Sequence, residues 1–125
     1  MKKLILFTII FAISCEDTIN HNENHNSNLL FVSSEGTYGN GDGSISVFYD
    51  NEMIQTVEEV GDVVQSIIVN NDHLFVIINN SHKIKRYTIT ESGLNLPGID
   101  IETINSSPRE MVIVDDKLYF TNWNS

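Results

Sequence analysis

Few residues in this chain are of a type and spacing that could do chemistry. The 125-residue sequence has one cysteine, Cys15, four histidines, and neither a G-x-S-x-G nor an H-E-x-x-H motif. The thiol lies at the end of an apolar run, where acylation is the reaction open to it. His73 and His82 are isolated in sequence, and Asp42 lacks the alternating carboxylates of a calcium loop. We therefore predict a binding protein with no catalytic residue, no metal site and no cofactor.

The first residues have the layout of an export signal. Lys2 and Lys3 precede an apolar stretch at residues 4–13, which Ser14 and Cys15 follow. Ten helical residues cover about 15 Å, half of a hydrocarbon core of roughly 30 Å, so this stretch cannot span a bilayer. We predict that residues 1–14 are a signal peptide that is removed after export.

The residues at the predicted cut, Ala12-Ile13-Ser14-Cys15, resemble a lipobox, in which the thiol is acylated and becomes the first residue of the mature protein. The alternative is a plain secretory signal beside an unrelated cysteine, and the place of Cys15 at the end of the apolar run favours the lipoprotein. We expect a lipid on Cys15 to hold the protein at a membrane. A single thiol also excludes a disulfide within the monomer.

Residues 15–28 are predicted to be the lipidated cysteine and a flexible polar tether. Ile19 is the one apolar residue after Cys15 in this segment, which cannot bury enough surface to offset its chain entropy. A metal site at His21, Glu23 and His25 is the alternative, but a floppy segment supplies no fixed ligand set.

The charge of the chain excludes one class of partner. The formal net charge is -10 at pH 7, and removing residues 1–14 leaves five basic against seventeen acidic residues. Contacts to phosphate need Lys and Arg, so this surface disfavours nucleic acid and anionic headgroups. We predict no nucleic-acid partner.

Beyond the tether the sequence repeats with a period of 44 residues. Leu30, Leu74 and Leu118 each open a Leu-aromatic-Val or Leu-aromatic-aromatic triplet at this interval, and the segments 67–72 and 111–116 share the same spacing. Repeats of about 40 to 45 residues that hold four short strands each are typical of β-propeller blades.

The apolar runs are short, rich in β-branched residues and separated by Gly, Asn and Asp, which predicts strands and turns. The predicted strands are 29–34, 44–49, 53–57, 64–69, 74–78, 84–90, 99–104, 111–114 and 118–121. No segment after the signal predicts a helix. We predict an all-β fold, a β-propeller with four-stranded antiparallel blades.

Residues 29–125 hold only about two to two and a half such blades, because the first begins at its second strand and the third stops after its second. A propeller is stable when its blades close a ring. We therefore expect this chain to be the N-terminal part of a longer protein whose C-terminus supplies the missing first strand. The alternative is a self-sufficient β-sandwich, an architecture that does not usually carry a sequence period.

Three segments carry a family resemblance that covers residues 29–125. S-E-G-T-Y-G-N-G-D-G-S-I-S at 34–46, G-D-V-V-Q-S-I at 61–67 and V-I-I-N-N-S-H-K-I at 76–84 resemble the YncE-like, surface-layer-type propeller lipoproteins of Bacteroidetes, with Ser34 where that family usually has Asn. The acidic pair Glu16-Asp17 resembles the export tag of surface lipoproteins of the same phylum. The resemblance implies a seven-bladed propeller, lipid-anchored (palmitate) in the outer membrane and exposed at the cell surface.

In such a fold every second connection lies on one face, which here comprises 35–43, 58–62, 79–82, 105–109 and the chain from 123 onward. These connections would gather seven candidate ligand-binding residues: Tyr38, Asn40, Asp42, Asn79, Asn80, Arg109 and Trp123. Aromatic rings with amide groups suit a rigid, amide-decorated ligand or a glycan. The alternative for the asparagines is that they only shape turns.

Some members of the resembled family capture corrinoids such as vitamin B12 for an outer-membrane transporter, and others have no established ligand. We expect a surface protein that captures a small nutrient, a corrinoid or a glycan, for such a transporter. The alternatives are a propeller enzyme of the lactonase or quinoprotein type and a structural or adhesive surface protein.

Overall fold

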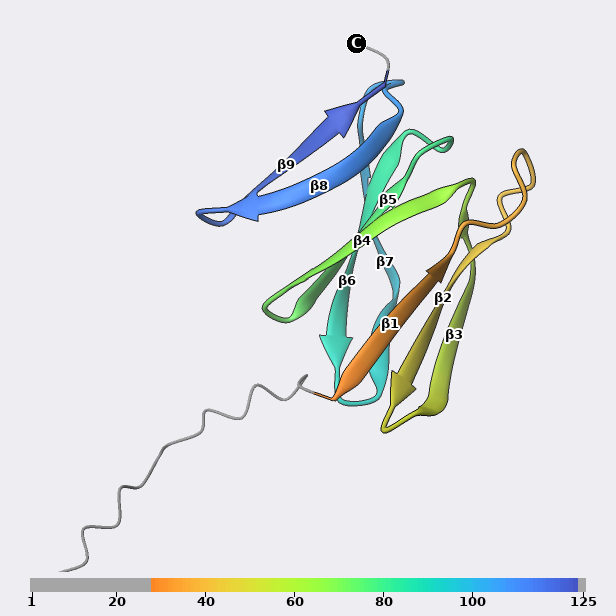
Figure 1. Ribbon diagram of the computed structural model, residues 1–125, viewed down its shortest axis with the longest axis vertical. Coiled ribbons are helices and arrows are strands. Elements are labelled where there is room, and N and C mark those ends of the chain that lie inside the picture. Colours follow the sequence, from red (N-terminus) through yellow and green to blue (C-terminus); the bar gives the residue numbers. More distant parts are fainter. Residues whose placement is uncertain (1–27, 124–125) are drawn as a thin grey trace, which may run out of the picture.

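The computed structural model describes residues 28–123, which form nine β-strands and no helix (Figure 1). The strands are β1 (Leu29–Ser34), β2 (Gly43–Tyr49), β3 (Glu52–Gly61), β4 (Val64–Asn70), β5 (His73–Ile78), β6 (Lys83–Thr90), β7 (Gly93–Glu102), β8 (Pro108–Val114) and β9 (Lys117–Asn122). They form antiparallel sheets ordered β1-β2-β3, β4-β5-β6-β7 and β8-β9. The predicted all-β class is confirmed. The predicted signal peptide, Cys15 and nearly all of the tether lie outside the described residues.

All nine predicted strands are present, but the predicted ends of three were wrong. β3 extends through Gly61, so the predicted connection at 58–62 shrinks to Asp62 and Val63. β7 begins six residues earlier than predicted, because residues 93–95 already pair with β6 ahead of the Pro97-Gly98 irregularity that hides the strand in the sequence. β8 begins at Pro108, which moves Arg109 from a connection into a strand. Across residues 28–123, no helix is long and apolar enough to cross a membrane.

The hairpins at one end of the molecule close through two-residue turns. Asp50 and Asn51 both have positive φ, as do Asp115 and Asp116, and Asn71 has a φ of 52°. Asn and Asp tolerate this left-handed backbone better than other residues with a side chain, and such turns match the twist of the paired strands. Asp115 and Asp116 therefore have the backbone of a hairpin turn, and Asp72 completes the turn that Asn71 begins between β4 and β5.

The sequence period reappears in the pairing of the strands. Val69 pairs with Leu74 between β4 and β5, and Ile113 pairs with Leu118, 44 residues further on, between β8 and β9. Both hairpins also have a register shift near the start of their first strand. The strands β8 and β9 of the third sheet therefore pair in the same register as β4 and β5, the first two strands of the second sheet.

The core lies between the first two sheets. Its buried members come from β2 to β7 and comprise Ile45, Val47, Val57, Val60, Val64, Leu74, Val76, Ile78, Tyr87, Ile89 and Leu94. β1 contacts β4, and β4 in turn contacts β8, so the first strands of successive sheets lie next to one another. On its other face, which contacts β8 through β4 and β5, the second sheet buries the cross-strand pair Ile77 and Ile84.

The faces that point away from the second sheet are open. Leu30 is 57% exposed, whereas Leu74, its counterpart one period later, is fully buried. Val32 and Val76 differ in the same way, and Tyr119 is exposed on the third sheet. Burial at these equivalent positions therefore depends on whether a neighbouring sheet covers them.

Gln55 joins the outer strands of the first two sheets. Its Nε2 donates to the carbonyl of Leu94 at 2.9 Å, and its Oε1 accepts from the N–H of Leu94 at 2.6 Å. Leu94 is 4% exposed. A Cβ on Gly93 would lie 2.4 Å from Gln55 Oε1, so glycine makes this approach possible.

Gln55→Leu is expected to lower the free energy of unfolding by about 2 kcal/mol, because two buried backbone groups of Leu94 lose their partner. Urea denaturation would measure this, with Thr88→Val, a change on an exposed side chain, as the control. Equal stability of the two variants would contradict the role of Gln55.

Tyr87 makes the stability of the core depend on pH. Burial raises the pKa of its phenol to about 12, and the Asp100 carboxylate contributes in the same direction. An unfolded tyrosine titrates near pH 10, so the neutral form is favoured in the fold. The contribution of the neutral phenol to stability is complete below pH 10 and falls by about 2 kcal/mol as the pH rises to 12.

We expect Tyr87→Phe to remove this alkaline loss, because the ring stays and the ionisable group goes. Urea denaturation of both proteins between pH 8 and pH 12 would measure it. A parallel decline in the two proteins would assign the loss to other groups.

Candidate functional site

The longer connections gather at one end of the molecule, opposite the two-residue turns (Figure 1). We call this the loop end, and it consists of residues 35–42, 62–63, 79–82 and 103–107 together with Trp123. Strands in an antiparallel sheet alternate in direction, so every second connection reaches the same edge. The sequence-derived candidate residues all lie in these connections or directly beside them.

Asp62 ties the first three of these connections together. Its Oδ1 accepts the N–H of Gly39 at 2.9 Å, and its Oδ2 accepts from Nδ2 of Asn80. Its own N–H donates to Ser81 Oγ at 2.9 Å. These partners are 23, 18 and 19 residues away in sequence. Sequence reasoning passed over Asp62 as a site residue because no local pattern reveals such distant partners.

Asp42 organises its own connection. Its carboxylate accepts the N–H of Thr37, and this bond is the main cause that holds the pKa of Asp42 below its usual value. Gly36 has a φ of 80°, and a Cβ there would lie 2.6 Å from Asp42 Oδ1. These contacts give the candidate residue Asp42 a structural part in shaping this connection. Tyr38 and Asn40, in contrast, extend from the same connection as exposed residues.

The segment Ser106-Ser107-Pro108 is held through each of its carbonyls. Nδ1 of His82 hydrogen-bonds to Ser106 at 2.7 Å, the N–H of Trp123 donates to Ser107 at 3.0 Å, and Nδ2 of Asn79 donates to Pro108 at 2.8 Å. Within residues 28–123, the buried hydroxyl of Ser106 has no hydrogen-bond partner. The bonds from His82 and Asn79 fix the start of β8 to the second sheet, and the bond from Trp123 fixes it to the end of β9.

The amides of Asn79 and Asn80 are therefore occupied within the protein. Asn79 connects the second sheet to the third, and Asn80 connects it to Asp62. Both residues act on the shape of the loop end, which is the alternative that the sequence left open for them. The Asn40 side chain hydrogen-bonds to the Asp42 carboxylate, which leaves Tyr38, Arg109 and Trp123 as the candidates whose side chains do not shape the connections.

Arg109 and Trp123 are brought together by the fold. The guanidinium carbon of Arg109 lies 4.1 Å from the centroid of the Trp123 ring, a cation–π contact. Trp123 is nevertheless 74% exposed. Arg109 lies within a register shift between Pro108 and Met111, where the N–H of Glu110 donates to Thr121 Oγ1 at 3.3 Å. Bulges of this kind re-aim side chains and are common beside functional sites.

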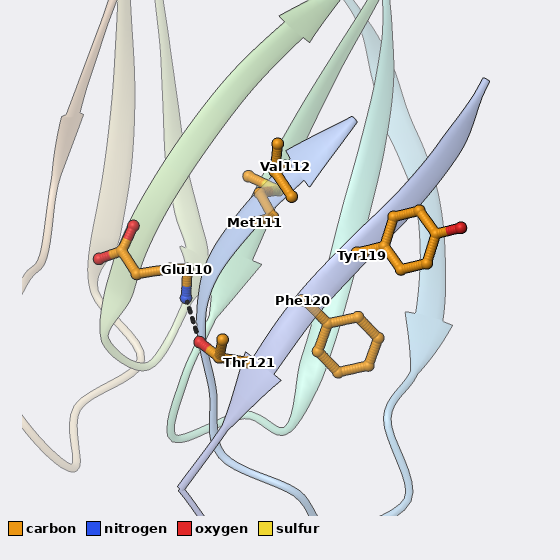
Figure 2. A pocket seen from close by; sticks show the side chains of 6 residues that line it. All are labelled: Glu110, Met111, Val112, Tyr119, Phe120 and Thr121. Carbon is orange, nitrogen blue, oxygen red and sulfur yellow. Dashed lines mark hydrogen bonds between the residues drawn. The ribbon is translucent and has the colours of Figure 1, made fainter. Parts of the chain in front are cut away.

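An apolar hollow of about 200 Å³ lies on the third sheet. Figure 2 shows its lining residues, which are Tyr119 and Phe120 on β9, Met111 and Val112 on β8, and Glu110 and Thr121, which a hydrogen bond joins. A second hollow, of about 210 Å³, follows β6 and β7 around Arg86, Thr88 and Asn95. Both lie where a sheet face lacks a neighbour, so we interpret them as uncovered packing surface.

In the described part of the chain, no group of three or more His, Cys, Asp or Glu side chains could hold a metal ion. No protein-family model matches the chain, and no curated protein matches it. Function is therefore inferred from the loop end itself.

Proposed function

We propose that this protein is a lipid-anchored surface protein whose loop end binds a small ligand. The observation that carries the proposal is a pair of exposed aromatic rings on a braced scaffold. Tyr38 and Trp123 are 76% and 74% exposed, yet the connections beside them are fixed by Asp62 and Asn79. A binding surface that is ordered in advance loses little entropy when a ligand arrives.

The sheets are proposed to be successive blades of a β-propeller. Support comes from the strand register that recurs after 44 residues, from the contacts of β1 with β4 and of β4 with β8, and from connections that share one end. The open faces agree with this arrangement. Leu30 and Tyr119 are exposed where further blades would cover them, and Ile99 is exposed where a complete third blade would pack.

The proposed setting is the outer membrane, with the lipid on Cys15 and the loop end presented at the cell surface. A corrinoid or a glycan captured there would pass to an outer-membrane transporter. Aromatic rings provide flat apolar contact, and amide and guanidinium groups provide hydrogen bonds, which fits either ligand class.

Isothermal titration of the purified protein against cobalamin and a panel of glycans tests the binding. We expect one class to bind, and Trp123→Ala and Tyr38→Ala each to weaken it at least tenfold, while circular dichroism stays unchanged. Tyr49→Ala is the matched control, since Tyr49 is an exposed tyrosine beside the turns at the opposite end. No heat from any ligand would refute the proposal.

The anchor is tested separately in cells supplied with labelled palmitate. The label is expected on the protein and absent from Cys15→Ser. Protease added to intact cells should digest the protein if the loop end faces outward, and full protection would place it elsewhere.

A further inference from the structure

Arg109 is the cation at the loop end of this acidic protein. Lys83 and Lys85 are both paired with Asp100, at 2.9 and 3.1 Å, Arg86 lies in the middle of β6, and Lys117 starts β9 beside the turn at the opposite end. Among residues 28–123, no acidic side chain pairs with Arg109, whose guanidinium lies against Trp123 instead. An unneutralised guanidinium is therefore available at the loop end.

The position of Arg109 recurs in the repeat. One period earlier stands Gln65, which occupies the register shift at the start of β4 as Arg109 occupies that at the start of β8. β4 and β8 contact each other, so these two half-buried residues lie at corresponding points of neighbouring strands. Neither side chain hydrogen-bonds to another residue of the described chain, which leaves their donors unused.

The backbone beside Arg109 is fixed before any ligand binds. Asn79 holds the carbonyl of Pro108, and the N–H of Trp123 holds the carbonyl of Ser107. Stacking on Trp123 further limits the orientations of the guanidinium. A cation restricted in this way can present two parallel N–H groups to a carboxylate or phosphate at little entropic cost.

We infer that Arg109 and Trp123, with Gln65 at the corresponding point of the neighbouring strand β4, form a subsite for an anionic group carried on a ring, such as the carboxylate or phosphate of an acidic sugar. The guanidinium donates to the anion, and the exposed indole stacks on the ring. The net charge of -10 repels anions from the protein as a whole. Salt screens exposed charges beyond the Debye length, roughly 8 Å at physiological salt, so Arg109 attracts an anion only within about that distance. This inference rests on the proposed ligand-binding function and selects the charge class of the ligand.

The chain contains a single tryptophan, Trp123, so its fluorescence reports directly on this subsite. The probes are trigalacturonate, glucose 6-phosphate and neutral maltotriose, which separate a carboxylate, a phosphate and no charge. We expect at least one charged probe to half-saturate the signal at a concentration at least tenfold below maltotriose. Arg109→Gln should reduce that difference to less than twofold, and raised salt should do the same. Lys117→Gln, which removes an equal charge at the opposite end, should leave it unchanged.

A second measurement needs no ligand. Iodide should quench Trp123 more strongly than caesium does, and Arg109→Gln should abolish this preference. The inference is overturned if maltotriose binds as well as the charged probes, or if Arg109→Gln leaves iodide quenching unaltered. In either case, heat from cobalamin or a neutral glycan in the titration above would show that the proposed function survives.

Discussion

Leu74→Ala is expected to destabilise the protein by about 3 kcal/mol or more, whereas Leu30→Ala should change its stability by less than about 0.5 kcal/mol. The two leucines are separated by one 44-residue period, and each is the second residue of its strand, β5 or β1, and begins a Leu-Phe-Val triplet. Leu74 is fully buried between two sheets, and Leu30 is 57% exposed on an open face. Loss of a buried leucine removes its transfer free energy and leaves a cavity, and an exposed leucine has little of either to lose.

Urea denaturation of the two variants beside the parent protein would measure the difference. Because chemistry and repeat position are the same, each variant serves as the control of the other. Comparable losses at both positions would mean that a second sheet covers Leu30 in solution, which contradicts an open face on the first sheet.

Gly98→Ala is the second change with a large expected effect, with Gly39→Ala as its matched control. The two glycines have φ angles of 83° and 84°, so alanine meets the same left-handed backbone at both. At Gly98, a Cβ would lie 2.8 Å from Cδ1 and Cε1 of the buried Tyr87 ring and 3.1 Å from the carbonyl of Arg86. At Gly39, no heavy atom lies within 4 Å of it.

Gly39→Ala is therefore expected to cost about 1–2 kcal/mol, the strain of the backbone alone. Gly98→Ala should cost a further 1–3 kcal/mol or so, because the Tyr87 ring must shift within a packed core. Thermal unfolding followed by circular dichroism would rank the two variants. Equal costs would mean that the ring of Tyr87 moves freely, and this would also weaken the expectation of a raised phenol pKa.

The two comparisons share one physical point, which is that the environment of a residue follows from its neighbours in space and not from its place in the repeat. Leu30 and Leu74 have the same sequence context, and Gly39 and Gly98 have the same backbone conformation. The members of each pair differ in the atoms of other strands that lie next to them. At the loop end the same holds for Arg109 and Gln65, which occupy equivalent bulges, yet only Arg109 stacks on a tryptophan.

Several features of the fold were predictable because their signals are local. Strand alternation, turn residues and the 44-residue period identified nine strands and the all-β class, since each depends on neighbours within a few residues. The ends of β7 and β8 were not predictable in this way. The extra residues of β7 pair with β6 ahead of Pro97, and those of β8 lie in a register shift opposite β9. A local sequence pattern does not show which residues of a neighbouring strand will pair with them.

The sequence by itself determined the class of fold, the repeat and the set of aromatic and polar residues from which a site could be built. The tertiary structure alone decided that Asn79 and Asn80 brace the loop end, that Asp62 and Gln55 join neighbouring sheets, and that Arg109 meets Trp123. The physical reason is distance along the chain. The bonds of Asp62 and Gln55 to neighbouring sheets span between 18 and 39 residues, and no local pattern of residues encodes which groups a folded chain brings within 3 Å.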